Sequence, residues 1–557
     1  MSVDNRAVLD DLIERFLKDY NTFYPTNASF ILGIHDYDGM VPDFSPESVN
    51  SFKEKLNKYG DELKSTVDYT ALDAQGQFDY KIVEAHIEFE KLRHGPLRFF
   101  ERNPIMPYVY VFDVSNYIKR NYGPIEQRVE ALCRHLEATP RLIEQLEAKI
   151  DKNLPDSMVA IALELFGGNS KYFHGDLKVV PEPISPELQE RLNVAAENAG
   201  NALDHFVAFF KSMPKTAENN FAIGADNYRA MLRWSDGVEL SLEEVLAVGM
   251  ANMAENQAAI KDICAKLNPD LPFQEVIAQV SAVHPTNDKV VSTTRGYLEG
   301  IRDHLKKANL IDVPSEMLCI VAETPDFMRW IFADMETPGP YETKANEAHF
   351  YITPANPEWS PEQQENWLSR FNDYTIQIFS MHEAYPGHYL QHLHARKSHS
   401  EVARNLTSYA FIEGWAHYCE QMMMEEGYGK EDPTEYLKLW LAQRQEALVR
   451  DCRYICSIGL HTQGWTQQQA YQFYRDNAWM EDITALKEAQ RSTFDPGGLY
   501  YTLGKRMFYK LRQDYQAEQG DNFDLKAFHN LCLSYGMPQI PFLRKVLLKN
   551  DDGKILA

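Results

Sequence analysis

Long amphipathic windows dominate this sequence and constrain its fold more than any other feature. Proline and glycine fall between these windows, as expected at helix boundaries. β-rich segments are few and short, at residues 107–112, 317–322 and 347–353. The pattern predicts a mainly α protein with a small β-sheet. The expected helices span residues 47–67, 70–93, 125–151, 185–213, 241–266, 287–307, 361–384, 387–398, 406–426, 433–459, 466–474 and 502–517.

No Gly/Ser-rich linker, internal repeat or low-complexity tract divides the 557 residues. Hydrophobic residues make up 44% and aromatic residues 12% of the chain, which is enough for a large core and excludes an intrinsically disordered protein. We therefore expect one large domain over residues 1–557. Within it, residues 1–340 would form a mostly helical lobe or lid, and residues 341–557 would carry the functional site.

The formal net charge of −25 argues against nucleic acid or an anionic membrane as the main partner, because both require a basic protein face. No run of about 18 uncharged apolar residues is present that could span a bilayer. The N-terminal segment carries early acidic residues and lacks the apolar run of a signal peptide. The seven scattered cysteines are typical of free thiols in a reducing compartment. We predict a cytoplasmic protein and leave open whether it forms a homodimer.

Histidines are concentrated in one part of the chain. Five of the 17 histidines fall within residues 382–399, and residues 382–388 read His-Glu-Ala-Tyr-Pro-Gly-His. A metalloprotease helix normally carries H-E-x-x-H, because positions i and i+4 place both imidazoles on one face beside the glutamate. In this chain Pro386 occupies position i+4, and His388 follows at i+6, roughly 240° around an unbroken helix.

The proline and glycine between the two histidines change this geometry. Pro386 disrupts the helical hydrogen bonds behind it, and Gly387 permits the backbone angles that would turn His388 back. A kinked helix can then present His382 and His388 to one metal, with Glu383 beside them. The same spacing also arises by chance, so the run predicts a metal site only together with a third ligand.

The next predicted helix supplies that third ligand. Glu413 is our candidate, because a two-histidine hydrolytic zinc site needs one carboxylate and an open fourth position. Gly414 lets another backbone approach closely, and Trp415 can wall a pocket. His417 lies on the same face as Glu413 and, with Glu420, is a candidate to support the ligands from behind. A packed core histidine is an equally good interpretation of His417.

These residues resemble the motifs of a bacterial family, domain of unknown function 885. The family motifs H-E-x-x-P-G-H and E-G-W-A-x-Y correspond to residues 382–388 and 413–418 of this chain. Further matching segments extend the resemblance over nearly the whole chain. They are residues 32–38, 457–461, 464–465, 496–504 and 534–541. The family is similar to helical zinc peptidases such as angiotensin-converting enzyme and the thermostable carboxypeptidases. That similarity implies a zincin-like, two-lobed helical body with a deep central channel.

The resemblance also implies further site residues. Arg453 and His461 match the family and are candidates to hold the substrate or its oxyanion, and Tyr501 matches the family tyrosine if one position is gapped. Two positions depart from the family pattern. Ser457 stands where the family has aspartate, and Gly498 stands where it has glutamine.

A zinc-dependent peptidase acting on short peptides is the leading hypothesis, of carboxypeptidase or dipeptidase type, with one zinc per chain. Zinc on His382, His388 and Glu413 would lower the pKa of a bound water, and Glu383 would take the proton of that water and pass it to the leaving amine. A histidine or phenol, for which His461 and Tyr501 are candidates, would stabilise the tetrahedral oxyanion.

Substrate-binding residues are expected on the strand predicted near residue 347, which could pair with an extended peptide, and beside the metal ligands. The candidates are Asn346, Glu347, His349, Tyr351, Tyr385 and Trp415.

Three other functions stay open. An amidase or deacylase could use the same chemistry on a non-peptide amide. A non-haem iron oxygenase also uses two histidines and one carboxylate, although usually on a β-barrel. A helical binding protein without catalysis is the third alternative.

Overall fold

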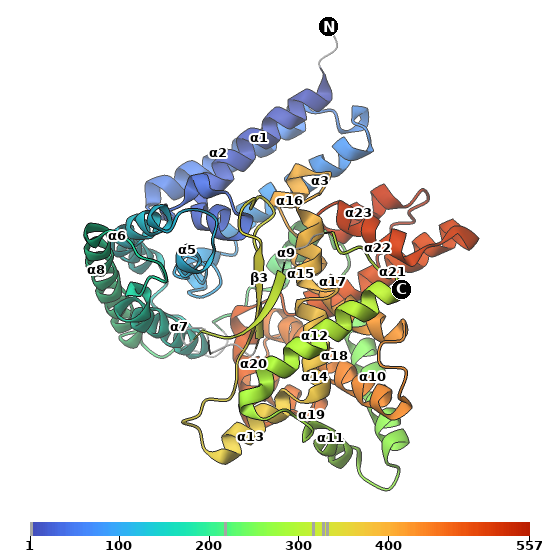
Figure 1. Cartoon of the computed structure of the whole chain (residues 1–557). Coiled ribbons are helices and arrows are strands. Elements are labelled where there is room, and N and C mark those ends of the chain that lie inside the picture. The colour runs from blue at the N-terminus through green and yellow to red at the C-terminus, as the bar shows by residue number, and fades with distance from the viewer. Residues whose placement is uncertain (1–3, 217–219, 315–317, 326–328, 330–332, 557) are drawn as a thin grey trace.

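The computed structural model describes residues 4–216, 220–314, 318–325, 329 and 333–556, and it confirms a mainly α fold with a small sheet (Figure 1). Six long helices and two short helices of four residues each build the first part of the chain in the described residues. They are α1 (Asn5–Phe23), α2 (Pro46–Thr66), α3 (Ala74–His94), α4 (Phe99–Arg102), α5 (Asn116–Lys119), α6 (Ile125–Lys149), α7 (Asp156–His174) and α8 (Pro186–Lys211).

The second part of the chain contains the longest helix, α18 (Pro433–Thr462), which runs through its centre. The other helices of this part are α9 (Ala225–Asp236), α10 (Leu242–Leu267), α11 (Phe273–Ser281), α12 (Val290–Lys307), α13 (Pro361–Arg370), α14 (Asp373–Glu383), α15 (His388–Ala395), α16 (Glu401–Asn405), α17 (Tyr409–Glu425), α19 (Gln467–Asn477), α20 (Asp482–Phe494), α21 (Tyr500–Gln519), α22 (Leu525–Ser534) and α23 (Ile540–Leu547).

Two hydrophobic cores divide the helices into two lobes. One core is built from residues between Leu9 and Phe210, and residues of the short helix α16 also belong to it. The other is built mainly from residues between Phe221 and Ile555. The boundary between the two cores falls between Phe210 and Phe221 in the sequence. The predicted boundary at residue 340 lies later, just before the strand that precedes the histidine-rich helices. The division at residue 340 stays a prediction.

A three-stranded sheet lies between the lobes, with the strand order β1-β3-β2 (Figure 1). β1 (Leu318–Glu323) pairs in parallel with β3 (Glu347–Ile352), and β2 (Ala333–Glu336) pairs antiparallel with β3. Two of the three predicted strands therefore exist, apart from residue 317, which lies outside the described residues. The strand predicted at residues 107–112 is wrong, because that segment forms consecutive turns such as Tyr108 N–H to Ile105 O.

A partly buried ionic contact connects the two lobes. His35 lies between Asp38 and Glu342, with its Nδ1 3.1 Å from Asp38 Oδ2 and its Nε2 2.6 Å from Glu342 Oε2. Tyr122 stacks on the imidazole of His35 at 3.7 Å between ring centroids. We call His35, Asp38 and Glu342 the interlobe clasp. Gly33 lies against it with φ of +76°, and a Cβ there would come within 2.9 Å of Glu342.

The helices that surround the histidine-rich segment begin at side-chain caps. Asn372 accepts the backbone N–H groups of residues 374 and 375 at the start of α14, and Ser408 accepts that of residue 411 at the start of α17. Asp432 does the same for α18. These caps satisfy donors that helix ends otherwise leave unpaired, so they fix where each helix begins. Within the described residues, every helix is too short or too polar to cross a membrane.

Candidate metal centre

The helix carrying the first histidine ends where the sequence predicts a kink. α14 stops at Glu383, the Tyr385–Pro386 peptide bond is cis, and α15 starts at His388. Gly387 is needed for space, since a Cβ at this position would lie 1.7 Å from the carbonyl oxygen of His382. Its φ of −72° and ψ of −134° lie outside the usual α and β regions, so the predicted reason for the glycine, unusual backbone angles, holds, and close approach adds a second reason.

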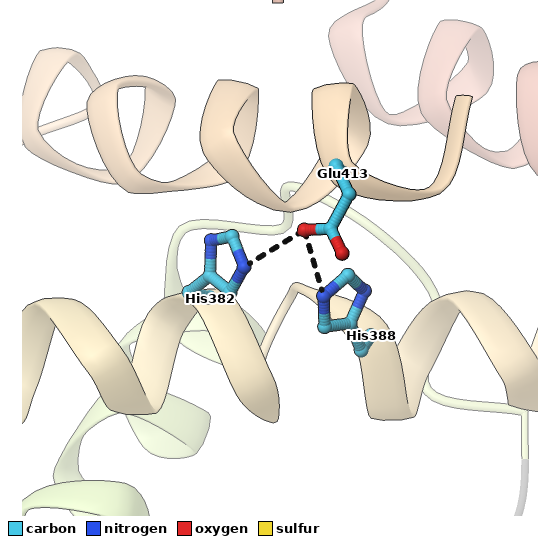
Figure 2. Close-up of side chains that lie close together, drawn as sticks. All are labelled: His382, His388 and Glu413. Atoms are coloured by element: carbon cyan, nitrogen blue, oxygen red, sulfur yellow. Dashed lines mark ion pairs between the residues drawn. The ribbon is translucent and has the colours of Figure 1, made fainter. Parts of the chain in front are cut away.

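The turn brings His382 and His388 together, and α17 places Glu413 opposite both of them (Figure 2). Glu413 Oε2 lies 3.4 Å from His382 Nε2 and 3.5 Å from His388 Nε2. The three side chains offer ligand atoms that all lie within 4.8 Å of one another. Residues 31 positions apart in sequence therefore meet around one point.

These distances fit a tetrahedral zinc site. Two ligands at roughly 2.1 Å from a tetrahedral ion lie about 3.4 Å apart, which is close to the separations between Glu413 and each histidine. Glu413 Oε2 and His388 Nδ1 are buried and make no hydrogen bond within the described part of the chain. Buried polar atoms are normally paired, so a carboxylate oxygen left in this state fits a position beside a cation.

A second layer of residues holds the first histidine from behind. Glu420 Oε1 accepts a hydrogen bond from His382 Nδ1 at 2.8 Å, and Glu420 Oε2 accepts one from His417 Nδ1 at 3.1 Å. Arg450 Nη2 also lies 3.2 Å from Glu420 Oε1. Because His382 donates from Nδ1–H to Glu420, its Nε2 is the nitrogen whose lone pair is left for the metal position. His417 and Glu420 thus occupy the supporting positions predicted for them.

Burial and charge act in opposite directions on these groups. Burial alone would raise the pKa of Glu413, but His388 and His382 outweigh it and hold the pKa well below its usual range. Burial would likewise raise the pKa of Glu420, but Arg450 and His417 keep it low. Both carboxylates are therefore ionised, as a metal ligand and its support must be.

The three candidate ligands face a cavity of about 530 Å³. Glu383 lines it beside His382, and Tyr501 lines it from α21. Strand β2 contributes Asp334 to another wall. Burial and the nearby Glu383 raise the pKa of Asp334 to about 7. The remaining charged side chains of the walls are four arginines and two glutamates: Arg370, Glu446, Arg450, Arg453, Glu488 and Arg491.

Most of these arginines are neutralised by close carboxylates. Arg453 forms a two-pronged ion pair with Glu488, at 2.7 Å from Nε and 2.6 Å from Nη2. Arg450 Nη1 lies 3.1 Å from Glu446, and Arg370 Nη1 lies 2.7 Å from the same carboxylate. The predicted candidate Arg453 therefore reaches the cavity, but its guanidinium is already bound to Glu488.

Tyr501 lies where the sequence predicts a phenol near the metal. Its ring stacks against that of His382 at 6.4 Å between centroids. Its hydroxyl accepts a hydrogen bond from Arg491 Nη2 at 3.1 Å and lies 3.2 Å from the hydroxyl of Tyr409. Burial and Glu413 raise the pKa of Tyr501, so its hydroxyl stays protonated and available as a donor.

His461 is not part of this cavity, which corrects the prediction for this residue. It lies eight residues beyond Arg453 on α18, roughly 12 Å further along the helix. It is buried, and its Nε2 lies 3.0 Å from the carbonyl oxygen of Ser492. Its ring lines a second, mainly apolar cavity of about 290 Å³. Burial lowers the pKa of His461 to about 4, so it is a neutral core histidine.

The residues predicted to bind substrate also lie elsewhere. β3 is the central strand, with β1 paired to residues 347–352 on one edge and β2 paired to residues 349–352 on the other. His349 and Tyr351 therefore offer no free edge to an extended peptide, which corrects the predicted pairing with substrate. Glu347 pairs with β1 alone among the described residues, and Asn346 precedes the strand. Two aromatic candidates lie in the core behind the ligands. Tyr385 packs against Tyr389, and Trp415 is fully buried and donates from Nε1 to Pro386 O at 2.9 Å.

Sequence reasoning missed Asp334 and Arg491, and it did not single out Arg450. Residues 446, 450 and 453 repeat at i, i+4 and i+7, which is a pattern that could have indicated a charged face of α18. Asp334 and Arg491 come from segments more than 150 residues apart, and no local pattern marks either of them.

The two departures from the family pattern lie outside the cavity. Ser457 is buried, donates to Pro496 O at 2.6 Å and lies 2.8 Å from the hydroxyl of Tyr228. It thereby holds the turn that precedes α21. A Cβ at Gly498 would lie 3.3 Å from the carbonyl oxygen of Arg453, so this glycine packs directly on the helix that carries the arginines.

The sequence matches the family described as bacterial protein of unknown function (DUF885) over residues 25–547. The chain belongs to this family. The fold is shared with a candidate lipoprotein of unknown function from Shewanella oneidensis, at a TM-score of 0.77 and 23% identity, covering 97% of this chain and 100% of that one. A candidate lipoprotein from Colwellia psychrerythraea matches with a TM-score of 0.78 and 16% identity, over 98% and 99% of the two chains. No curated protein gives a significant match to this sequence.

Proposed function

We propose that this DUF885 protein is a zinc-dependent hydrolase that cleaves amide bonds in short peptides. The observation that carries the proposal is the convergence of His382, His388 and Glu413 on one point at the wall of a cavity that Glu383 also lines. Two histidines and one carboxylate are the ligand set of hydrolytic zinc sites that leave a fourth position open. The zincin-like character of the fold rests on this same set and is part of the proposal.

Bound zinc would supply Lewis acidity, which lowers the pKa of water and polarises the scissile carbonyl. Glu383 is placed to act as general base. It follows His382 directly, lines the cavity and makes no ion pair or hydrogen bond with any residue in the described ranges. Its carboxylate can therefore take the proton of the attacking water and return it to the leaving amine.

Tyr501 is the group best placed to stabilise the oxyanion. Arg491 donates to its phenolic oxygen, which leaves the phenolic proton free to point into the cavity. An O–H donor fixed before the reaction stabilises charge that develops in the transition state more than charge in the ground state. His461, the other sequence candidate for this role, is too distant to contribute.

The alternatives make different predictions about the same residues. An amidase or deacylase would use the same machinery and differ only in substrate. An iron oxygenase would use the same three ligands, but it would give no task to Glu383. A binding protein without catalysis would show no turnover in the wild type, and replacing Glu383 would leave its fold unchanged.

The decisive experiment measures metal content and peptide hydrolysis on matched variants. We expect about one zinc per chain in the wild type by elemental mass spectrometry, loss of zinc in His388→Ala, and full zinc in Glu383→Gln. His399→Ala is the control, because His399 belongs to the same histidine-rich run but is exposed and outside the cavity. Glu383→Gln should hydrolyse a peptide library at least about 100-fold more slowly than the wild type, the size of a general-base contribution.

Several outcomes would contradict the proposal. Wild-type turnover in Glu383→Gln would exclude the assigned base. Iron at the three ligands would favour an oxygenase, and zinc without hydrolysis of any peptide or simple amide would favour a binding protein.

Cellular location and partners are also proposals. The net charge of −25 supports a partner other than nucleic acid or anionic membrane. The sequence favours the cytoplasm, whereas the two structural neighbours are described as candidate lipoproteins, a class anchored at the cell envelope. Fractionation of cells followed by immunodetection separates the two locations. Sedimentation of the purified chain decides between monomer and homodimer.

A further inference from the structure

Arg491 differs from the other arginines of the metal-site cavity in how it is paired. Its two hydrogen bonds to Asp495 Oδ2, from Nε and Nη2, are each 3.4 Å long, beyond the usual range for a charge-assisted contact. Its Nη1 makes no hydrogen bond with any residue in the described part of the chain. By contrast, Arg453 is bound to Glu488 through two bonds of 2.7 Å or less.

Exposure separates the arginines in the same way. The side chain of Arg491 is 36% exposed, whereas those of Arg450 and Arg453 are 6% and 16% exposed. Arg491 lines the cavity, so this exposed part faces the space available to a substrate. Arg370 is 31% exposed as well, but its Nη1 is bound to Glu446 at 2.7 Å. Among the described arginines of the cavity, Arg491 is thus the one without a short carboxylate contact, and it lies close to the hydroxyl oxygen of Tyr501.

We propose that Arg491 binds the C-terminal carboxylate of the substrate, so that the protein acts on short peptides with a free C-terminus. This inference rests on the proposed hydrolase function and adds the substrate class and the direction of cleavage. A planar guanidinium with free N–H groups binds a carboxylate through two parallel hydrogen bonds, which also orient the bound molecule.

The distances fit cleavage near the C-terminus. Arg491 Nη2 lies 3.1 Å from the Tyr501 hydroxyl, and the Tyr501 ring lies 6.4 Å from that of the metal-site residue His382. An extended peptide advances roughly 3.5 Å per residue. A carboxylate on Arg491 would therefore place the scissile bond one or two residues before the C-terminus. A carboxylate on the side chain of the last residue has the same chemistry and must be distinguished by experiment.

The test uses three tetrapeptides that differ only at the C-terminal residue. The first has a free C-terminal carboxylate, the second has a carboxamide, and the third has a carboxamide with glutamate as its last residue. Wild-type protein loaded with zinc should cleave the first with a kcat/KM about 100-fold higher than the second, because the carboxamide cannot accept the two charge-assisted hydrogen bonds of a guanidinium. Cleavage of the third at the rate of the first would assign the site to side-chain carboxylates and overturn the C-terminal proposal.

Arg491 variants then locate the effect. Arg491→Ala should remove the preference for the free peptide over the carboxamide. Both peptides lose the hydrogen bond from Arg491 to Tyr501, and only the free peptide also loses the carboxylate contact. Arg491→Lys keeps the positive charge but not the two parallel N–H donors, so it should retain only part of the preference for the free peptide. Lys487→Ala removes an exposed cation from the same helix outside the cavity and should change neither peptide. An equal loss for both peptides in Arg491→Ala would show a structural role only and overturn the proposal.

Calorimetry separates this proposal from the hydrolase proposal. Peptide binding is measured in Glu383→Gln, which should hold the substrate without cleaving it, and again after Arg491→Ala is added. Tighter binding of the free peptide that disappears in the double variant supports the carboxylate site, even if no peptide is hydrolysed. Equal affinity for the free and amidated peptides, or no binding of either, overturns it, even if hydrolysis is observed.

Discussion

The crossing of α17 and α21 is the contact on which the position of Glu413 depends. At this crossing Gly414 lies against Gly504, and a Cβ added to Gly414 would come within 2.4 Å of Gly504 Cα and 2.5 Å of its carbonyl carbon. The contact is with backbone, so no side chain can move aside. Gly414→Ala must therefore push the two helices apart, and Glu413 is the adjacent residue.

The size of the displacement follows from van der Waals distances. Carbon atoms pack at about 3.5 Å or more, so a contact of 2.4 Å requires a shift of about 1 Å. The distance between zinc and a ligand atom tolerates a change of only about 0.2 Å, so the Glu413 side chain must take up part of the helix shift. We expect zinc affinity to fall about 10- to 100-fold, the range seen when residues that orient metal ligands are changed.

The expected loss of stability is moderate. Overpacking costs about 1–3 kcal/mol, and alanine regains up to about 1 kcal/mol of helix propensity. The net effect is therefore a loss of about 2 kcal/mol at most. With an unfolding entropy of about 2.1 cal/mol/K per residue, a chain of 557 residues that unfolds in one transition would lose only about 2 °C in Tm. Zinc affinity, measured by competition with a chelating dye, is the more sensitive assay.

Gly296→Ala is the matched control for Gly414→Ala. Gly296 lies inside α12, is exposed, and would place its Cβ in open space. The same substitution there should raise stability by up to about 1 kcal/mol and leave zinc affinity unchanged. Wild-type zinc affinity in Gly414→Ala would refute the argument, because it would show that the helix crossing does not set the position of Glu413.

Three other perturbations test separate parts of the structure. Tyr501→Phe should lower kcat for a cleaved peptide about 100- to 1,000-fold, with zinc content unchanged, because it removes one oxyanion donor; unchanged kcat would exclude this role. In metal-free protein, Asp334→Asn should be more stable than the wild type by roughly 2 kcal/mol at pH 8 and equally stable near pH 4 in urea unfolding. Burial and Glu383 raise the pKa of Asp334 in the folded protein to about 7, whereas the same carboxyl in the unfolded chain ionises at about pH 4. The wild-type carboxyl therefore lowers the stability of the fold progressively as the pH rises from about 4 to above 7. For His35, burial acts to lower the pKa, but Asp38 and Glu342 raise it to about 9, so the clasp contributes fully below pH 6.5 and is lost as the pH rises through 9. His35→Gln should therefore cost about 1–2 kcal/mol at pH 6, after allowance for its 31% exposure, and much less at pH 10; a cost that does not depend on pH would refute it.

Local patterns account for what the sequence predicted well. Helical periodicity is written into each segment, so a mainly α fold could be predicted without knowledge of tertiary contacts. The candidate ligands His382, His388 and Glu413 come from one stretch of the chain that runs from α14 to α17, and the turn between the two histidines is marked by proline and glycine. The sequence could therefore predict their convergence.

Tertiary contacts decide what the sequence could not predict. β2 alternates between apolar and polar side chains over only four residues, all of them partly buried, which is too short a pattern to predict a strand, and its pairing with β3 defines it. Residues 107–112 alternate, but the side chain of Asn103 accepts the N–H groups of residues 105 and 106 and starts a series of turns. His461 matches a family motif, yet its place along α18 puts it against a different cavity.

The cavity is assembled from two kinds of segment. The three candidate ligands and Glu383 come from α14, α15 and α17, whereas the walls are completed by side chains from β2, α13, α18, α20 and α21. Changes in these wall segments can alter which molecules enter and how they are oriented, while the ligand geometry on α14, α15 and α17 stays intact. Under the proposed hydrolase function, members of the family would keep the ligand set on α14, α15 and α17 and vary β2 and α20, so Asp334 and Arg491 are the positions at which we expect them to differ in specificity.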